Sequence, residues 1–346
     1  MKFRLPAPLA FLALLVSIAS LSAMAEIRWL ERDYDFGLWK EIAGPKTGTS
    51  RFINLGPDTI AIVDVKPSCG CTSASFTDTP IAPGDTAMVS YTYDPTMRPG
   101  KFEKSVRVSL SDGTRQTLRI RGNVLGTPES LASLFPVDAG EVRYSDSVVA
   151  FGRVSFGRAP LGFVNAYVLS QDSILPKLST TSDALQITPS VDKAGPGDIV
   201  TYSLSLNTER LNRYGPVEIL AGPVKVTAII VPDTDRLMLQ QQGKSPSITA
   251  DPSMLDLGQI SASSINLEFT VRNEGKAPLE LLSIYPSSEA IKIVKYPSVI
   301  KPGKKGAVKI EIDPSRLNRG PQRQSIEIIS NDPRNPQLSL PVPLQY

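Results

Sequence analysis

Short stretches of alternating hydrophobic and polar residues run along most of this chain. In residues 87–93, Val89, Tyr91 and Tyr93 fall on one face of an extended strand and the residues between them on the other. Residues 104–110 alternate in the same way, and the Asp112-Gly113 pair that follows is typical of a hairpin turn. Turn residues about every 8–12 positions around such strands predict a β-sandwich or a β-barrel.

The alternation predicts strands in three successive parts of the chain and no helix of note. The expected strands are 34–38, 50–55, 59–65, 87–93, 104–110 and 116–122 in the first part, residues around Val154, 161–169, 200–206 and 224–231 in the second, and 269–271, 279–284, 308–312, 326–329 and 338–342 in the third.

Landmark residues recur with a period of about 100 residues, which indicates repeated domains because solenoid units are only ~20–50 residues long. The landmarks are a first glycine (Gly37, Gly140, Gly258), a second glycine (Gly56, Gly157, Gly275), a Pro-Gly pair (Pro83-Gly84, Pro196-Gly197, Pro302-Gly303), an Asp or Asn (Asp94, Asn207, Asp313) and a last glycine (Gly100, Gly215, Gly320).

These landmarks predict a domain over residues 26–126, a diverged domain over 127–239, a linker over 240–247 and a third domain over 248–346. In the diverged copy, 50 residues separate Gly157 from Asn207, against 38 between the matching positions of each other copy. The difference predicts an enlarged loop around residues 171–193.

The first 25 residues have the pattern of an export signal. Lys2 and Arg4 precede an apolar run over residues 9–19, and Ala23-Met24-Ala25 is a small-residue cleavage site. The run is short for a membrane-spanning helix, and no later stretch qualifies as one. We therefore expect cleavage after Ala25 and a periplasmic or extracellular protein.

Composition argues against two classes of function, nucleic-acid binding and catalysis. The full sequence has 37 basic and 34 acidic residues, and removal of Lys2 and Arg4 brings these numbers close to balance, which argues against nucleic acid as a partner. There is no histidine to act as a general base, and no phosphate loop or nucleophile-elbow motif. The sequence predicts a protein that is not an enzyme.

Cys69-Gly70-Cys71 contains the only two cysteines. On an extended chain their Cα atoms would lie about 6.6 Å apart, near the upper limit for a disulfide, although Gly70 allows a bend. Three interpretations compete: a local disulfide, favoured in an exported protein; two thiolates that bind Cu(I); and a redox or isomerase site. Zinc is disfavoured because two thiolates leave two of its positions empty.

The other copies lack this pair. Counted from the second glycine, Cys69 and Cys71 align with Ser170 and Asp172 in the diverged copy and with Ser288 and Ala290 in the last copy. The fold therefore does not require the cysteines, and a specialised role for them in the first domain becomes the more interesting hypothesis.

The Ser68-Cys69-Gly70-Cys71-Thr72 motif, with Asn54-Leu55-Gly56 before it and Pro83-Gly84 after it, resembles domain-of-unknown-function family fifteen-seventy-three, which is common in exported proteins of Bacteroidetes-like bacteria. The resemblance is close over the first domain, covers only the frame of the third and is weak in the second. It implies an all-β chain of three tandem immunoglobulin-like sandwiches. It implies no activity, so no catalytic residue is carried over.

Four Asp-Ser/Thr-apolar tripeptides resemble the O-glycan acceptor pattern of such exported proteins, although turn-rich β proteins also contain these tripeptides by chance. The candidate acceptors are Thr59, Thr86, Ser147 and Ser173.

Five arginines flank the turns after the Asp or Asn landmarks, where solvated turn residues are the favoured interpretation and a ridge for an acidic partner is the alternative. They are Arg210, Arg213, Arg316, Arg319 and Arg323.

The sequence as a whole predicts an exported, non-enzymatic interaction or scaffold protein with a protein partner and no cofactor. One alternative is a redox or Cu(I)-handling thiol protein acting through Cys69 and Cys71. Another is a chaperone-like module that pairs an exposed edge strand with its clients.

Overall fold

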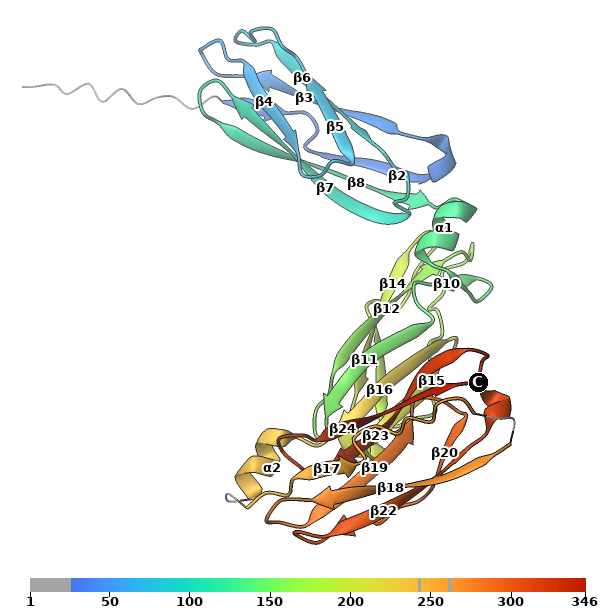
Figure 1. Cartoon of the computed structure of the whole chain (residues 1–346). Coiled ribbons are helices and arrows are strands. Elements are labelled where there is room, and N and C mark those ends of the chain that lie inside the picture. The colour runs from blue at the N-terminus through green and yellow to red at the C-terminus, as the bar shows by residue number, and fades with distance from the viewer. Residues whose placement is uncertain (1–25, 242–243, 261–262) are drawn as a thin grey trace, which may run out of the picture. The chain divides into compact units, whose positions relative to one another are not determined.

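A computed structural model describes residues 26–241, 244–260 and 263–346 (Figure 1). The expected signal peptide, residues 1–25, lies outside the described residues. The chain divides into two compact units, one of Met1–Thr96 and Lys101–Val124 and the other of Met97–Gly100 and Leu125–Tyr346. No helix among the described residues is long and apolar enough to cross a membrane.

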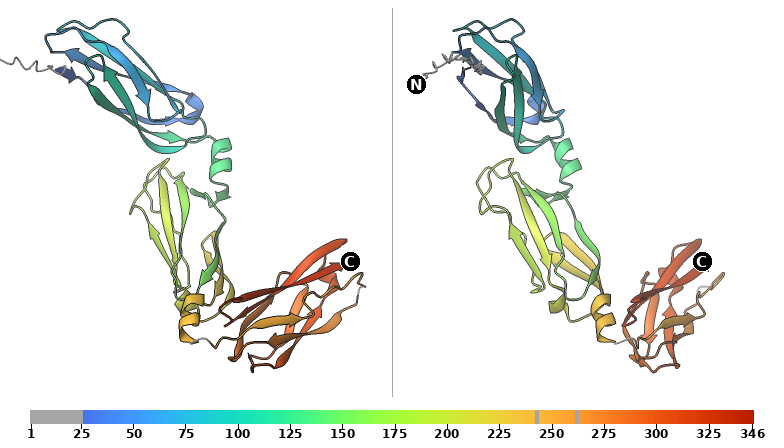
Figure 2. Two further views of the ribbon diagram at one scale, coloured as in Figure 1. Left: turned by 60° about the vertical axis from the view of Figure 1, so that its left-hand side comes forward. Right: turned by 90° about the vertical axis from the view of Figure 1, so that its left-hand side faces the viewer.

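The first unit contains a sandwich of two four-stranded sheets, seen from two further sides in Figure 2. The predicted alternation decides its core, since Val89, Tyr91 and Tyr93 are buried and the residues between them are not. In sheet order, the strands are β1 (Ile27–Trp29), β3 (Lys46–Asn54), β6 (Thr86–Tyr93) and β5 (Thr72–Phe76), and β2 (Asp33–Lys40), β8 (Arg115–Leu125), β7 (Gly100–Leu110) and β4 (Ile62–Pro67).

The second unit begins with a sandwich of a five-stranded and a three-stranded sheet. In sheet order, these are β13 (Leu185–Pro189), β14 (Ile199–Leu206), β12 (Leu161–Val168), β10 (Val142–Tyr144) and β9 (Val137–Asp138), and β11 (Val148–Ser155), β16 (Val224–Val231) and β15 (Gly215–Ala221).

The same unit ends with a sandwich of two four-stranded sheets. In sheet order, these are β17 (Ile248–Asp251), β18 (Ile265–Asn273), β22 (Lys305–Ile312) and β20 (Ile291–Lys295), and β21 (Val299–Ile300), β19 (Leu279–Pro286), β23 (Pro321–Ser330) and β24 (Gln337–Gln345).

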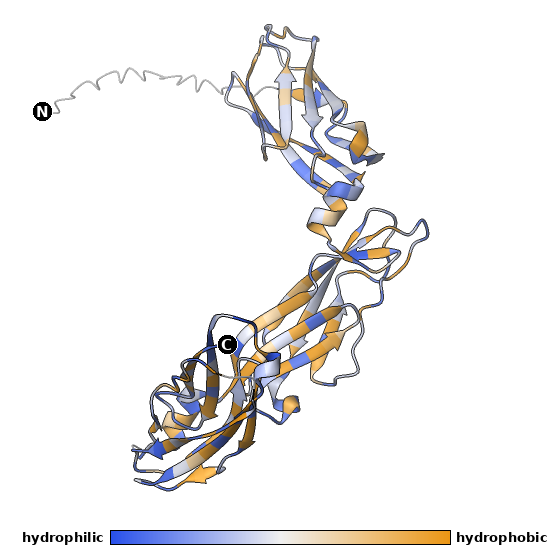
Figure 3. Cartoon of the chain, turned by 45° about the vertical axis from the view of Figure 1, so that its right-hand side comes forward, coloured by the Kyte–Doolittle hydropathy of each residue, from blue (hydrophilic) through white to orange (hydrophobic). Residues whose placement is uncertain are grey.

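The predicted all-β, immunoglobulin-like fold class is confirmed. Each sandwich has its own cluster of buried hydrophobic residues. Hydrophobic and hydrophilic positions alternate along the strands, as the orange and blue bands of Figure 3 show. The predicted division into three domains stays a prediction, because the compact units number two.

Two short α-helices, which the sequence analysis did not predict, occupy the junctions: α1 (Pro128–Leu134) and α2 (Thr234–Gln240). Helix α1 begins at the predicted boundary between the first two domains. Its N-cap is Thr127, whose side-chain oxygen accepts the N–H of Ser130, and Pro128 fills the first turn. Three short 3-10 helices lie at η1 (Glu41–Ala43), η2 (Thr208–Leu211) and η3 (Pro314–Arg316).

A buried asparagine closes strand β3. The Nδ2 atom of Asn54 donates to the carbonyls of Asp58 (2.8 Å) and Ile81 (3.0 Å), and its Oδ1 accepts the N–H of Gly56 (3.0 Å). Asn54 is fully buried, so these bonds satisfy every polar atom that its amide brings into the core.

Asn273 repeats this arrangement at the end of β18. It donates to the carbonyls of Ala277 (2.8 Å) and Ile300 (2.9 Å) and accepts the N–H of Gly275 (3.0 Å). The Asn-x-Gly sequence therefore marks the same strand-to-loop junction in both the first and the last sandwich.

The predicted alignment of the diverged copy is wrong. In the first copy, the main chain of Asn54 bonds to the Pro-Gly turn, and Val168 makes the matching bonds to Gly197 and Asp198 in the diverged copy. Val168 is thus the equivalent of Asn54, and the second landmark falls on Ser170, not on Gly157. From Ser170 to Asn207 there are 37 residues, so the predicted enlarged loop does not exist.

Candidate functional site

The cysteine motif lies in the turn between β4 and β5, where the chain crosses from one sheet of the first sandwich to the other. Cys69 and Cys71 form a disulfide, with Cα atoms 5.2 Å apart. This distance is shorter than the extended-chain expectation because Ser68–Cys71 form a turn and not a continuous strand. Of the three interpretations from the sequence, this arrangement corresponds to the local disulfide.

The bridge is packed against the core on one side. Cys71 is 7% exposed and belongs to the buried cluster, while Cys69 is partly buried against it. The hydroxyl oxygen of Thr72 lies 3.6 Å from Sγ of Cys69 and 3.8 Å from Sγ of Cys71. The carbonyl of Cys71 accepts the N–H of Asp94 at 2.9 Å. These contacts hold the turn in one conformation.

An aromatic cluster fills the same end of the sandwich. Thr72 is paired across β5 and β6 with Tyr93, whose ring stacks on Phe102 at 3.8 Å between centroids. The ring of Trp39 meets both of these rings edge-on, and Nζ of Lys46 lies 5.2 Å from its centroid. The bridge therefore borders a tightly packed core region.

The matching turn of the last sandwich has the same main-chain bonds without cysteines. The carbonyl of Ala290 accepts the N–H of Asp313 at 2.8 Å, and Ile291 donates to the carbonyl of Ser288 at 3.1 Å. The predicted equivalence of Ser288 and Ala290 to the two cysteines agrees with this geometry.

In the diverged copy the predicted equivalents, Ser170 and Asp172, are wrong. The carbonyl of Ala184 accepts the N–H of Asn207 at 2.8 Å, the bond that Cys71 makes in the first sandwich. Ser182 takes the position of Cys69, because Leu185 donates to its carbonyl. The error came from the misplaced second landmark.

A polar groove of about 480 Å³ lies on the outer face of the first sandwich. The pKa of the Asp35 carboxyl is held below its usual range, first by the N–H of Gly37 and then by Arg121, whose Nε lies 3.0 Å from its Oδ2. Lys101 and Glu103 also line the groove. Acidic and basic groups alternate here, as on an ordinary solvated sheet face.

Metal binding at the cysteines stays a prediction. Within residues 26–241, 244–260 and 263–346, no group of three or more His, Cys, Asp and Glu side chains is placed to hold a metal ion. Cu(I) would have to use the two sulfurs after reduction of the bridge.

The four candidate glycan acceptors are all exposed, as attachment would require: Thr59, Thr86, Ser147 and Ser173. Their modification stays a prediction.

The arginines do not form one ridge. Arg210 and Arg213 line a groove beside β15, whereas Arg323 lines another groove beside β24. Nε of Arg316 lies 3.4 Å from Oδ2 of Asp313. The sequence had no signal for the groove beside β15, because it depends on which strands are paired.

The family described as "Protein of unknown function (DUF1573)" matches residues 27–124 and 248–341, more than half of the chain. No curated protein matches this chain.

Solved structures with similarity include a protein of unknown function from Porphyromonas gingivalis W83, at 18% identity over 60% of this chain and 100% of that one, with a TM-score of 0.49. A PapD-like domain of human CEP192 is 10% identical over 35% of this chain and 99% of its own, with a TM-score of 0.26. The extracellular cadherin domains 1–4 of Protocadherin Gamma B7 are 14% identical over 94% and 77%, with a TM-score of 0.22.

Proposed function

This chain belongs to the DUF1573 family, and from that premise we propose that it is an exported, non-enzymatic interaction or scaffold protein of the bacterial cell envelope. The observation that carries the proposal is the disulfide between Cys69 and Cys71. The two sulfurs are bonded to each other in a turn that main-chain hydrogen bonds and core packing hold. The residues with the most distinctive chemistry in the chain are thus bonded to each other, and the exposed edges and faces of the sandwiches are available for partners.

Export agrees with this use of cysteine, because disulfides persist in oxidising compartments. The expected cleavage after Ala25 would release a mature chain of sandwiches into the periplasm or the medium. Such domains bind other proteins through strand edges, loops and sheet faces. A protein partner in the same compartment is the expected ligand.

Affinity capture after cross-linking in the native host tests the proposal. We expect the mature chain to retain one or a few envelope proteins in near-stoichiometric amounts. A chain that captures none, and that instead turns over disulfide substrates or holds Cu(I) at stoichiometry, would show that the thiol interpretation is the right one.

A further inference from the structure

Strand β15 has a free edge. In the first sandwich β4 pairs with residues 106–110 of β7, and in the last sandwich β19 pairs with residues 326–330 of β23. Counted from the equivalent glycines Gly100, Gly320 and Gly215, these residues correspond to 221–225, at and beyond the end of β15, and β15 itself pairs only with β16. Among the described residues, no main-chain hydrogen bond joins β15 to a strand other than β16, although its first residue, Gly215, lies against Ser283 and Tyr285 of β19. The three-stranded sheet thus lacks the fourth strand that completes its two counterparts.

The residues that would form the fourth strand are present but lie elsewhere. The bridge between Ile174 and Ala194 matches the one between Ile60 and Ile81 just before β4, so residues 176–181 correspond to β4. The carbonyl of Pro176 accepts the hydroxyl of Tyr202. These residues form no strand.

The next carbonyl is also bonded away from β15. Lys177 accepts the hydroxyl of Tyr144 at 3.3 Å, and Tyr144 and Tyr202 belong to β10 and β14 of the opposite sheet. Strand β15 has 7 residues, against 11 in β7 and 10 in β23, so it also lacks the length that pairs with β4 and β19 in the other sandwiches.

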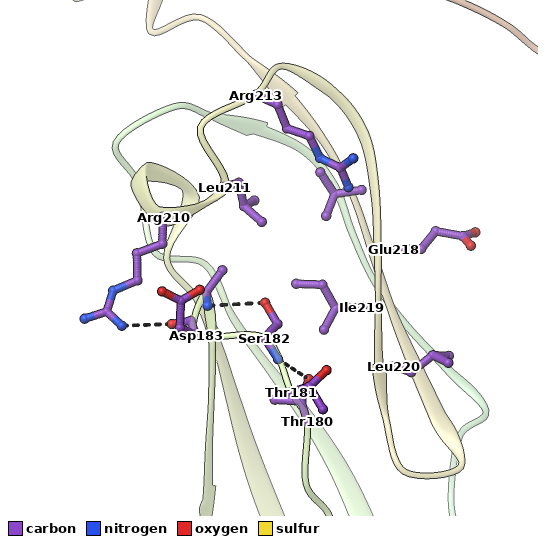
Figure 4. A pocket seen from close by; sticks show the side chains of 12 residues that line it. Thr180, Thr181, Ser182, Asp183, Arg210, Leu211, Arg213, Glu218, Ile219 and Leu220 are labelled. Atoms are coloured by element: carbon purple, nitrogen blue, oxygen red, sulfur yellow. Dashed lines mark hydrogen bonds between the residues drawn. The ribbon is translucent and has the colours of Figure 1, made fainter.

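A groove of about 510 Å³ lies beside this free edge, between β15 and residues 180–184 (Figure 4). Val217 and Ile219 are buried and form its apolar side, and Figure 4 shows Ile219 pointing toward the opposite wall. Glu218 and Leu220 point away from it. The inward side chains of an added strand would lie beside the first pair at the edge of the core, and its outward side chains would lie beside the second pair on the outer face.

The opposite wall is fixed by hydrogen bonds. The N–H of Ser182 donates to Oγ1 of Thr180 at 3.2 Å, and the N–H of Ala184 donates to Oγ of Ser182 at 3.3 Å. The guanidinium of Arg210 donates to the carbonyl of Asp183 at 3.0 Å (Figure 4). A wall that is already ordered loses little conformational entropy when a ligand binds.

Arg213 supplies the charge at one end of the groove. Its side chain points into the space beside β15, and it has no ion pair with any residue that the structure describes. It lies two residues before the start of β15, at the end where an antiparallel strand would finish. The nearby carboxylate of Glu218 points away and lies 3.5 Å from Nζ of Lys225.

We propose that this groove binds an extended peptide strand of a protein partner, paired antiparallel to β15, with a carboxylate near its C-terminal end beside Arg213. The main chain of the strand would bond to the unpaired outer edge of β15, and its alternate apolar side chains would pack beside Val217 and Ile219. This inference deepens the proposed binding function and rests on it.

A second copy of the chain fits less well. If two β15 strands paired antiparallel about their centres, Glu218 of each would face the other, and like charges directly opposite each other destabilise a sheet. The same pairing would bring no carboxylate to Arg213.

The test uses the mature chain and a labelled peptide, Thr-Val-Thr-Ile-Ser-Val-Glu, with a free C-terminal carboxylate. We expect saturable binding by fluorescence anisotropy, and hydrogen exchange that slows at β15 when the peptide is bound. The same peptide with Gln for Glu and an amidated end should bind less tightly. Arg213→Glu should weaken binding about tenfold, because the attraction between the guanidinium and the peptide carboxylate becomes repulsion between two carboxylates.

Arg319→Glu is the matched control. Arg319 is exposed in the equivalent turn of the last sandwich and does not line the groove beside β15, so its change should leave binding within about twofold. Equal losses for both variants, or no protection of β15 at millimolar peptide, would overturn the proposal. So would protection that rises with protein concentration without peptide, since the occupant would then be a second copy.

The outcomes also separate this inference from the proposed function. If cross-linking captures a partner equally well with wild type and Arg213→Glu, the chain binds proteins through another surface and the groove assignment is wrong. If cross-linking captures nothing, the proposed function itself fails.

Discussion

Asn54 and Asn273 show how one side chain can fix a junction between strand and loop. Each makes three hydrogen bonds in the core, and replacement by alanine removes all three, although the carbonyl of Ile81 keeps the N–H of Ile60. We expect Asn54→Ala and Asn273→Ala each to cost about 2–4 kcal/mol. Calorimetry of the mature chain would measure this, with exposed Asn266→Ala as the control. Equal melting of all three variants would contradict the assigned role.

The cysteine pair should contribute much less to stability. Its loop is so short that the bridge removes far less chain entropy than the ~3 kcal/mol expected for a 15-residue loop. Ser288 and Ala290 also hold the same turn without a bridge. Cys69→Ser combined with Cys71→Ser should therefore cost on the order of 1 kcal/mol or less, a melting shift of about 4–8 °C at most. A loss of tens of degrees would make the pair a core element.

Single residues were predictable where the main chain leaves no alternative. The last glycines, Gly100, Gly215 and Gly320, all have φ near +100°, a conformation that other residues rarely adopt. Their recurrence in the sequence repeat made them recognisable. The pairing of Cys69 and Cys71 stayed open because the distance between residues two apart depends on the turn between them.

At the scale of elements, the segment that should have been the fourth strand of the diverged sandwich depends on two buried tyrosines. Burial raises the pKa of Tyr202 to about 12, and it also raises the pKa of Tyr144. In the unfolded chain the tyrosine hydroxyls ionise near pH 10. The stabilisation that comes from keeping the two buried hydroxyls protonated is therefore present below pH 10 and is lost as the pH rises toward 12.

Tyr202→Phe should cost about 1 kcal/mol at neutral pH, because the hydrogen bond to Pro176 is lost. It should also make the fall in melting temperature between pH 10 and 12 less steep. Calorimetric scans over this pH range check both effects. Parallel curves for the wild type and the variant would show that Tyr202 ionises equally in both states.

Strands were predictable from alternation, but helix α1 and the register of the diverged copy were not. Helix α1 has only 7 residues, too few for a hydrophobic period, although Thr127-Pro128 is a recognisable start. The alignment of the diverged copy was wrong because Gly157 was taken as the second landmark. The residue that structurally corresponds to Gly56 is Ser170. The groove beside β15 could not be predicted, since it is bounded by residues 180–184, which follow a segment that forms no strand.

For the whole molecule, the junction before β17 should be the first place that a protease cuts. Lys244 is exposed outside any helix or strand, whereas the carbonyls of Ser245 and Ser247 accept N–H groups of Lys276 and Glu274. Brief trypsin treatment should therefore release a fragment that begins at Ser245. First cuts within β22 would place the boundary elsewhere.

We propose that this protein works by binding another protein and not by thiol or metal chemistry. Quantitative cross-linking and mass spectrometry of intact envelopes from the native host measure this most directly. The account predicts a reproducible partner in near-stoichiometric amounts, cross-linked to the mature chain with its Cys69–Cys71 bridge intact. Envelopes in which the chain has no such partner, and in which the two cysteines are reduced and metal-bound or in mixed disulfides, would contradict it.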